Sequence, residues 1–364
     1  MKAVILVGGQ GTRLRPLTHT IPKAMLPLLN IPFLKYVFEL LKRHGIQEII
    51  LSTGNFLDIF ENYFGDGTKH DLKIRYVKED EPLGTAGAIK NVEKYLDDDF
   101  FIVLNGDILT DLNITKLVEY HQSKKALATL ALASVEDPTS YGLVPIDSKG
   151  KVVDFLEKPG WDKVVTNFIN AGTYVFKSEV LNFIPEGMNY SFEKGVFPKM
   201  VEKEEKIYGF PSNAYWLDIG TPQKYLKAHH DILERQIKFN FKGKQVKPKV
   251  WIGKNCKISA EANIFGPVVI GDNCQIEANA TIFGYTTIGD NCMIGSGATI
   301  GESIFFKACK VGSSSIIKKS ILCNGIELGV KVNVEDMAIA EEEKISLVDS
   351  SYNLAKKERL NDRT

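Results

Sequence analysis

The chain has 364 residues, which is long enough for two domains that each bury a core. Its 45 Lys and Arg balance 45 Asp and Glu, so the formal net charge is zero, which argues against a general nucleic-acid-binding protein. No apolar stretch reaches the ~18 residues of a transmembrane helix, and residues 1–7 lack the length and cleavage pattern of a signal peptide. We therefore expect a cytoplasmic protein that does not contact membranes.

The first predicted element is a buried parallel strand over Ala3–Val7, which runs directly into the segment GGQGTRLRPLT. Glycines in this loop allow the backbone to approach a ligand, and free N–H groups of such a loop bind anions. Arg13, Arg15 and Lys23 add positive charge close to the loop. The segment therefore predicts a site for a polyanion such as a nucleoside triphosphate.

Two common phosphate-binding motifs do not fit this loop. In the dinucleotide-binding pattern a third glycine would follow Gly9 and Gly11, and Leu14 stands in its place. The Gly-Lys-Ser/Thr triplet that ends a P-loop is also missing from the segment.

Short apolar runs alternate with helical patterns as far as about residue 230. The predicted strands after the first are Glu48–Ser52, Lys73–Val77, Phe100–Leu104, Ala128–Ala133 and Ala171–Phe176. Leu34, Val37, Phe38 and Leu41 share one face of a helix predicted over Phe33–His44, and Gly45 is a typical stop.

This alternation predicts a Rossmann-like α/β domain with a mostly parallel sheet. Ligands of such sheets bind beyond the carboxyl ends of the strands. Gly8–Arg13 and Asn105–Asp107 each follow a predicted strand and fall at that edge.

A second pattern begins after about residue 235. Isoleucine stands at every sixth position from Ile252 to Ile300, nine times in succession, and small residues precede each isoleucine by two places. This hexapeptide period predicts a left-handed parallel β-helix in which three hexads make one coil. The register slips near Phe306, which indicates a loop or a change of coil, and it resumes at Val311, Ile317, Leu328 and Val334. We expect a catalytic domain over 1–235, the β-helix over 236–340, and a charged tail or helix over 341–364.

The five cysteines all lie in the β-helix region and form no C-x-x-C pair, which argues against a zinc site. Cys256, Cys274 and Cys292 recur at a spacing of one coil, so we expect them to stack as small apolar side chains rather than to bind metal or oxidise.

A series of further motifs resembles the sugar-phosphate nucleotidyltransferases, also called NDP-sugar pyrophosphorylases. After the glycine-rich loop and Pro22-Lys23, the matching segments are Glu79–Gly87, Leu104–Asp107, Tyr141-Gly142, Glu157–Pro159, Asn170–Gly172, Phe192–Pro198 and Trp216–Gly220. The resemblance covers about residues 1–230 and is strongest to the branch that makes GDP-mannose. It implies that a sugar 1-phosphate attacks the α-phosphate of a nucleoside triphosphate in line and releases pyrophosphate, with Mg²⁺ as cofactor.

The resemblance also implies the site residues. Nucleotide binding is expected at Val7, Gly8, Gly9, Gly11, Thr12, Arg13, Lys23, Glu79, Pro82, Gly84, Thr85, Asn105 and Asp107. Sugar-phosphate binding is expected at Tyr141, Gly142, Glu157, Lys158, Asn170 and Thr173. Asp107 and Asp218 would hold the metal, Arg13 and Lys23 would stabilise the departing pyrophosphate, and Lys158 would complete the catalytic set.

Glu79 predicts the nucleotide base. In the thymidylyl- and uridylyltransferases that the chain resembles, a glutamine occupies this place, five residues before Gly84. A carboxylate only accepts hydrogen bonds, and guanine offers two adjacent donors, so glutamate favours GTP. Glu79 could instead face solvent or pair with Lys78 or Lys90.

Rival functions differ in what they require. An acyltransferase built on the β-helix needs a histidine base, and all six histidines lie at or before His230. A non-catalytic regulatory paralogue would have lost the charged site residues, which are all present. Glucose-1-phosphate thymidylyl- or uridylyltransferase and heptose-1-phosphate guanylyltransferase stay open, with GTP and mannose 1-phosphate preferred. We expect a homo-oligomer to which the β-helix contributes.

Overall fold

A computed structural model describes residues 1–340 of the chain, so the predicted tail over 341–364 lies outside the described residues. The chain divides into two compact units. The first comprises residues 1–10, 22–24 and 34–218. The second contains the rest, including the amino-terminal segments 11–21 and 25–33.

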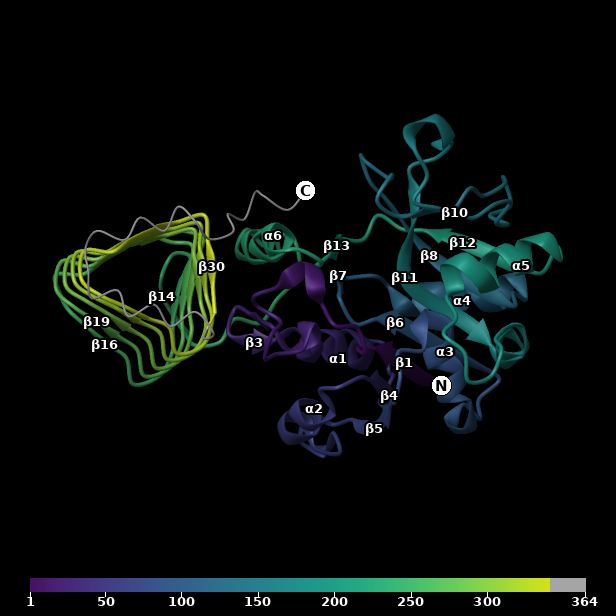
Figure 1. Cartoon of the computed structure of the whole chain (residues 1–364), viewed down its shortest axis with the longest axis horizontal. Coiled ribbons are helices and arrows are strands. Elements are labelled where there is room, and N and C mark those ends of the chain that lie inside the picture. Colours follow the sequence, from purple (N-terminus) through teal and green to yellow (C-terminus); the bar gives the residue numbers. More distant parts are fainter. Residues whose placement is uncertain (341–364) are drawn as a thin grey trace. The chain divides into compact units, whose positions relative to one another are not determined.

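The first unit is a mixed α/β layer (Figure 1). Its strands are β1 (Lys2–Leu6), β4 (Glu48–Thr53), β5 (Lys73–Lys78), β6 (Phe100–Asn105), β7 (Ile108–Thr110), β8 (Ala128–Ser134), β9 (Gly142–Leu143), β10 (Leu156–Glu157), β11 (Phe168–Lys177), β12 (Ile207–Pro211) and β13 (Trp216–Asp218). Its helices are α1 (Phe33–Arg43), α2 (Leu57–Phe64), α3 (Gly84–Asn91), α4 (Ile114–Lys124) and α5 (Phe197–Glu202).

The central sheet follows the order β10-β9-β11-β6-β1-β4-β5. Strands β6, β1, β4 and β5 are parallel, as the alternating pattern predicts. Strand β11 is antiparallel to β6 and to β8, and β8 in turn pairs in parallel with β12. The parallel half therefore brings the carboxyl ends of β1 and β6 side by side, with Leu6 opposite Asn105.

The predicted elements of this unit are confirmed. Each predicted strand lies within an observed strand or overlaps it, because long runs of apolar residues fill the core on both faces of the sheet. Val4, Val103 and Tyr174 are completely buried in that core. Helix α1 ends at Arg43, and Gly45 follows with φ of 74°.

The second unit contains a parallel β-helix with a triangular cross-section (Figure 1). Helix α6 (Pro222–Leu233) precedes the β-helix in the chain. The hairpin of β2 (Pro27–Leu28) and β3 (Ile31–Pro32) belongs to the same unit. Its first face consists of β14 (Lys244–Lys247), β15 (Val250–Ile252), β18 (Val268–Ile270), β21 (Thr286–Ile288), β24 (Ile304–Phe305), β27 (Ile321–Leu322) and β30 (Ala338–Ile339). The second consists of β16 (Lys257–Ile258), β19 (Gln275–Ile276), β22 (Met293–Ile294), β25 (Lys310–Val311) and β28 (Glu327–Leu328). The third consists of β17 (Asn263–Ile264), β20 (Thr281–Ile282), β23 (Thr299–Gly301), β26 (Ile316–Lys318) and β29 (Asn333–Glu335).

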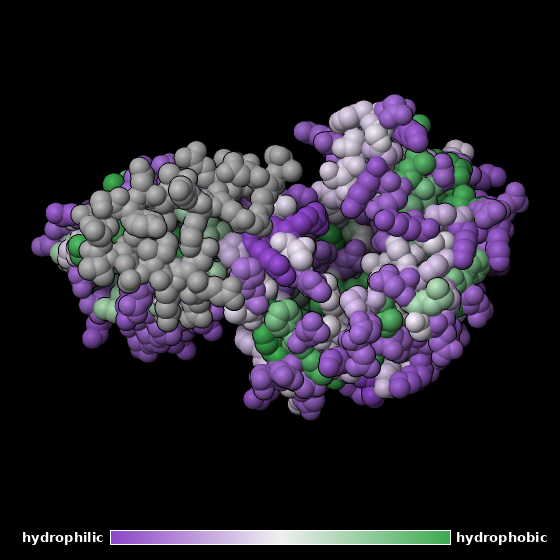
Figure 2. Space-filling view, viewed as in Figure 1, coloured by the Kyte–Doolittle hydropathy of each residue, from purple (hydrophilic) through white to green (hydrophobic). Residues whose placement is uncertain are grey.

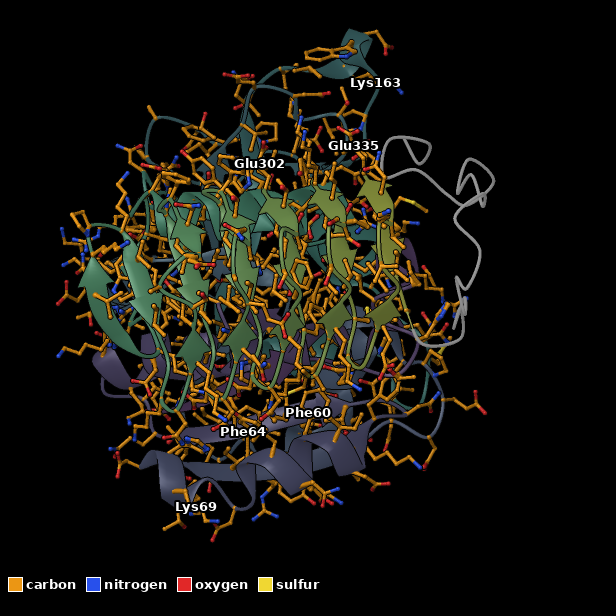
Figure 3. All side chains as sticks on the ribbon, turned by 90° about the vertical axis from the view of Figure 1, so that its left-hand side faces the viewer. Phe60, Phe64, Lys69, Lys163, Glu302 and Glu335 are labelled. Atoms are coloured by element: carbon orange, nitrogen blue, oxygen red, sulfur yellow. The ribbon has the colours of Figure 1, made fainter. Side chains whose placement is uncertain are left out.

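Strands of successive coils lie side by side along the β-helix (Figure 3), and its short strands and hexapeptide period are those of a left-handed parallel β-helix. The register slip has a simple origin. Ile270 pairs with Ile288, which is three full hexads later. Ile288 in turn pairs with Phe305, and Phe305 with Leu322, and each of these partners comes one residue earlier than three hexads would place it. Each later coil is thus one residue shorter at one corner, and the inward-facing positions stay buried.

The cysteines pack as expected. The thiols of Cys256, Cys274 and Cys292 donate hydrogen bonds to backbone carbonyls of the next coil at 3.0 to 3.1 Å. Cys309 continues this column with a hydrogen bond to the carbonyl of Cys323 at 3.1 Å. Hydrogen bonding to Cys292 and burial raise the pKa of the Cys274 thiol far above its ordinary value, so it stays protonated.

Hydrophilic residues cover most of the visible surface of the first unit (Figure 2). Within residues 1–340 no helix combines the length and the apolar character needed to cross a membrane.

Candidate active site

The site is built where β1 and β6 end. The amide of Gly106 donates to the carbonyl of Leu6 at 2.9 Å, which holds the loop after β6 against the end of β1. A Cβ at position 106 would lie 2.5 Å from Val7 Cγ1, so only glycine allows this close approach. The turn places Asp107 at the carboxyl edge of the sheet, as the sequence predicts.

Lys23 joins the two aspartates that the sequence assigns to the metal. Its Nζ lies 2.5 Å from Asp107 Oδ2 and 3.6 Å from Asp218 Oδ1. Asp218 is brought there because β13 pairs with β7, which sets Asp218 opposite Ile108. The side chains of Lys23 and Asp218 are 14% and 12% exposed, so this charged cluster is largely shielded from water. Such shielding strengthens the electrostatic interactions within it.

Glu79 lies beside the glycine-rich loop and pairs with neither Lys78 nor Lys90. Its Oε1 accepts a hydrogen bond from the Ser52 hydroxyl at 2.9 Å, and its Oε2 accepts one from the Leu83 amide at 3.2 Å. A Cβ on Gly8 would come within 2.7 Å of Glu79 Oε1. Gly8 and Glu79 therefore lie in direct contact, at the edge where a nucleotide is expected.

The turn at the start of α3 packs against a segment far along the chain. Gly84 adopts φ of 71°, and a Cβ there would lie 2.7 Å from the carbonyl oxygen of Tyr190. The Thr85 hydroxyl donates to Glu193 Oε2 at 2.9 Å and accepts from the Phe192 amide at 2.9 Å. The predicted nucleotide residue Thr85 is thus already engaged by the Phe192–Pro198 motif. Pro82 is exposed in the same turn.

Four predicted sugar-phosphate residues come together on β9 and β10 and directly beside them. These strands pair so that Gly142 faces Glu157, and the Lys158 amide donates to the Tyr141 carbonyl at 3.0 Å. Burial and the nearby Glu193 carboxylate raise the pKa of Glu157, and the charges of Lys158 and Lys194 oppose the shift. The Glu157 carboxylate can accept hydrogen bonds from sugar hydroxyls, and the Lys158 ammonium beside it suits the phosphate of the same ligand.

Asn170 and Thr173 approach the same edge from β11. The Asn170 amide donates to the Tyr174 hydroxyl at 2.8 Å, and Thr173 is buried opposite Leu104 of β6. Between them the register of β11 shifts around Gly172, where a Cβ would lie 2.7 Å from Asn105 Nδ2. The buried Asn105 Oδ1 has no hydrogen-bond partner among the described residues.

The remaining nucleotide residues divide between the units. Gly9 follows Gly8 in the first unit, with open space where its Cβ would be. Gly11, Thr12 and Arg13 belong to the second unit, where Gly11 has φ of 62° and its carbonyl accepts from the Thr18 hydroxyl at 2.8 Å. Thr12 and Arg13 are exposed. Their place beside Lys23 stays a prediction.

Sequence reasoning missed three contributors. Glu193 accepts hydrogen bonds from the Thr85 and Ser191 hydroxyls, and its charge helps to raise the pKa of Glu157. The Phe192–Pro198 motif, in which it lies, is the sequence signal that could have indicated it. Ser52 holds Glu79, and nothing in its local sequence marks it. The Trp216 indole donates to the Ala171 carbonyl at 3.0 Å and packs edge-on against the Tyr141 ring.

Two other features of the described residues bear on the site. Across residues 1–340 there is no cluster of three or more His, Cys, Asp or Glu side chains arranged to hold a metal ion. A cavity of about 540 Å³ lies at the amino ends of β1, β4 and β5, where Lys2 pairs with Asp97 and Lys73 pairs with Glu48. It is at the opposite edge of the sheet and contributes no group to the site.

A mostly parallel α/β sheet with acidic and basic side chains at its carboxyl edge, followed by a hexapeptide β-helix, fits the class of sugar-phosphate nucleotidyltransferases. The chain belongs to the Nucleotidyl transferase family, whose model matches residues 2–235, and residues 264–351 match the model described as GMPPB C-terminal domain.

Individual relatives agree with this family. The chain is 44% identical over 232 residues to a mannose-1-phosphate guanylyltransferase of Mycobacterium tuberculosis, a match that spans 64% of either protein. It is 38% identical over 283 residues to a UTP–glucose-1-phosphate uridylyltransferase of Synechocystis, covering 74% of this chain and 73% of that one. Among solved structures, HddC from Yersinia pseudotuberculosis complexed with GMP-PN shares 35% identity with a TM-score of 0.55, over 64% of this chain and 99% of that chain.

Proposed function

We propose that the protein transfers a nucleotidyl group from a nucleoside triphosphate, preferably GTP, to a hexose 1-phosphate, preferably mannose 1-phosphate. The products would be an NDP-sugar, GDP-mannose in the preferred case, and pyrophosphate. The observation that carries the proposal is the ion-paired group of Lys23, Asp107 and Asp218 at the carboxyl edge of the sheet, in a chain of the Nucleotidyl transferase family.

The reaction forms a bond from the sugar-phosphate oxygen to the α-phosphorus and breaks the bond from that phosphorus to the β-phosphate oxygen. The attacking phosphate is already an anion near neutral pH, so the protein has to align two anions rather than remove a proton. Lys23 and Arg13 would hold the β- and γ-phosphates and stabilise the charge that leaves with pyrophosphate. Lys158 would hold the sugar phosphate, with Glu157 and Asn170 on the sugar hydroxyls.

The residues present fit a magnesium ion. Mg²⁺ prefers oxygen ligands and is often bound through one or two carboxylates together with substrate phosphates. Asp107 and Asp218 supply two carboxylates that already converge on one cation, the Lys23 ammonium. When bound, the ion would supply positive charge that offsets the repulsion between the two phosphate groups.

Glu79 supports the preference for GTP. Each of its oxygens accepts one hydrogen bond from the protein, and each retains a second acceptor position. Substituting Glu79→Gln should reduce kcat/KM for GTP by about tenfold or more relative to UTP and dTTP. An unchanged base preference would remove Glu79 as the group that reads the base.

Lys23→Ala tests the reaction itself. Pyrophosphate release should fall by about 10²-fold or more, because the variant loses a charge that stabilises the leaving group. Lys73→Ala is the matched control, since Lys73 is an exposed lysine paired with Glu48 at the far edge of the sheet. Full activity of Lys23→Ala would refute the assigned role.

A second candidate function is uridylyl transfer to glucose 1-phosphate, because the uridylyltransferase of Synechocystis matches more of this chain than the guanylyltransferase of M. tuberculosis does.

We further propose that the protein forms a homo-oligomer in the cytoplasm and that the β-helix contributes to its assembly. Light scattering of the purified protein tests the assembly, and a monomeric mass would contradict it.

A further inference from the structure

Strand β4 lies between the two strands from which the glycine-rich loop and Glu79 emerge. It pairs in parallel with β1 on one side and with β5 on the other. At its carboxyl end the Ser52 carbonyl accepts from the Val7 amide at 2.9 Å, where the glycine-rich loop begins. The next carbonyl, that of Thr53, accepts from the Glu79 amide at 2.8 Å. The end of β4 therefore holds the starts of both segments, and all of these residues belong to the first unit.

The side chain of Ser52 is completely buried and adds a bond to the Glu79 carboxylate. Its hydroxyl donates to Oε1 at 2.9 Å, and the Leu83 amide donates to Oε2 at 3.2 Å. The last torsion of a glutamate side chain has a broad range of accessible values because it joins an sp³ carbon to an sp² carbon. One donor on each oxygen restricts that torsion. Contact with Gly8 restricts it further, since a Cβ there would lie 2.7 Å from Oε1.

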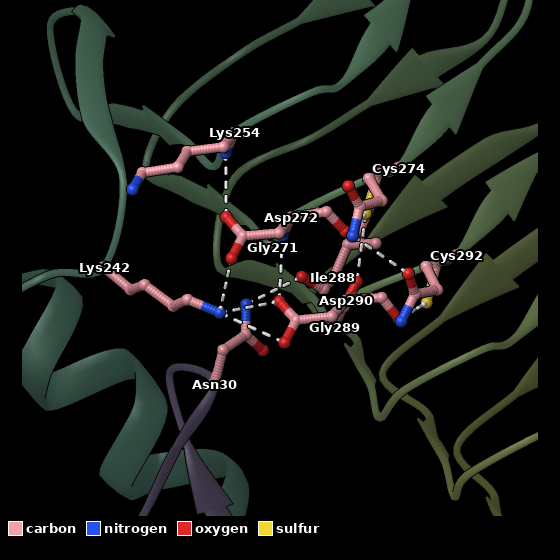
Figure 4. A network of polar contacts seen from close by, with 12 residues as sticks. Asn30, Lys242, Lys254, Gly271, Asp272, Cys274, Ile288, Gly289, Asp290 and Cys292 are labelled. Atoms are coloured by element: carbon pink, nitrogen blue, oxygen red, sulfur yellow. Dashed lines mark hydrogen bonds and ion pairs between the residues drawn. The ribbon is translucent and has the colours of Figure 1, made fainter.

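The Glu79 carboxylate differs from carboxylates that act only within the fold. Asp272 and Asp290 of the β-helix also accept hydrogen bonds from backbone amides, both at 2.8 Å. In addition, Lys242 Nζ lies 2.9 Å from Asp272 Oδ2 and 3.0 Å from Asp290 Oδ1 (Figure 4). Glu79 is half-buried, and across residues 1–340 its oxygens accept from Ser52 and Leu83 without an ion pair to any cation. The N–H groups of a bound base would add hydrogen bonds to a carboxylate that is already held in one orientation.

We propose that Ser52 is a positioning residue for base selection. Its hydroxyl holds the Glu79 carboxylate in the orientation in which both oxygens face the adjacent N1–H and N2–H donors of guanine at once. The assignment of Glu79 as the group that reads the base rests on the proposed function. Selection then depends on how the carboxylate is held as well as on its charge, so removal of the Ser52 hydroxyl should weaken the preference for a base with two adjacent donors.

The test compares GTP with ITP, whose base keeps N1–H and lacks the amino group at position 2. Dissociation constants are measured by isothermal titration calorimetry without a sugar phosphate, so that no turnover is needed. The wild type should bind GTP about tenfold or more tightly than ITP, because a hydrogen bond from the amino group to a carboxylate is charge-assisted. Ser52→Ala should reduce that ratio about threefold or more, since the carboxylate is then free to rotate.

Thr53→Val is the matched control. Thr53 is also completely buried at the end of β4, and its hydroxyl donates to the Val77 carbonyl at 3.4 Å rather than to Glu79. This variant should keep the wild-type ratio of the two dissociation constants. In a Glu79→Ala background, Ser52→Ala should change the ratio by less than about twofold, because Ser52 acts through Glu79. If Ser52→Ala does not fold, Ser52→Cys is measured in its place, since it keeps the shape of the side chain and replaces a strong donor by a weak one.

The outcomes separate the positioning role from the proposed function. An unchanged ratio in the Ser52 variant would overturn the positioning role, as would an equal fall in Thr53→Val or in the Glu79→Ala background. A wild type that binds GTP no more tightly than ITP would overturn it as well, because the amino group of guanine would then not be read. If the wild type releases no pyrophosphate with any pair of substrates, the proposed function fails, and the ratio of the dissociation constants still decides the role of Ser52.

Discussion

Gly172→Ala is the substitution whose cost the structure defines most closely. Gly172 has φ of 69°, and a Cβ there would lie 2.7 Å from Asn105 Nδ2, 3.0 Å from its Cγ and 3.2 Å from its Cβ. Rotating the Asn105 side chain cannot relieve the last contact, so the end of β6 has to move. We expect about 1–2 kcal/mol from the positive φ and about 1–3 kcal/mol from the forced contact.

Gly187→Ala separates the two contributions. Gly187 has φ of 66° but nothing within 4 Å of its added Cβ, so this variant should lose only the about 1–2 kcal/mol of backbone strain. The assay is urea unfolding followed by tryptophan fluorescence, in which Trp216 reports directly because its indole donates to the carbonyl of Ala171.

Activity should follow the same order. Gly172→Ala displaces Asn105, two residues from Asp107, and should reduce pyrophosphate release by about tenfold or more, while Gly187→Ala should leave it near the wild-type rate. Equal unfolding free energies and equal activities for the two variants would show that the contact with Asn105 has no energetic or catalytic consequence.

Two further predictions concern titration. Glu193→Gln removes the like charge that helps burial raise the pKa of Glu157, so the acid-side rise in KM for the sugar phosphate should move to lower pH; an unmoved profile would show that Glu157 is not the titrating group. Burial lowers the pKa of His121 from 6.5 to about 4, so the unfolded chain takes up a proton first and stability should fall as pH drops from 6.5 towards 4. His121→Leu should make the loss of stability between pH 7 and pH 5 smaller by about 2 kcal/mol, and an identical pH dependence of urea unfolding would contradict this.

The sequence predicts the architecture well because its signals are local. Apolar runs define β1, β4 and β6, and the spacing of Ile252 to Ile300 defines the β-helix, without any knowledge of distant contacts. The shortening of the coil between Ile288 and Phe305 by one residue is visible only once the strands are paired, because a loop would disturb the period in the same way.

The site is less accessible to such reasoning because its contacts join distant positions. The bond from Thr85 to Glu193 spans 108 residues. Motif order indicates that Lys23, Asp107 and Asp218 act together, whereas the grouping of residues 25–33 with the β-helix follows only from the fold. Glu79 is another example. The sequence predicts that its carboxylate can accept hydrogen bonds, but it does not predict the hydrogen bond from Ser52.

The central claim is nucleotidyl transfer with a preference for GTP and mannose 1-phosphate. It is tested most directly by pyrophosphate release with Mg²⁺ across GTP, UTP and dTTP, each paired with mannose, glucose and heptose 1-phosphates. We expect the highest kcat/KM for GTP with mannose 1-phosphate, and a release that falls by about 10²-fold or more in Lys23→Ala. No release from any pair would contradict the claim of catalysis, and a highest value for UTP or dTTP with glucose 1-phosphate would contradict the claimed specificity.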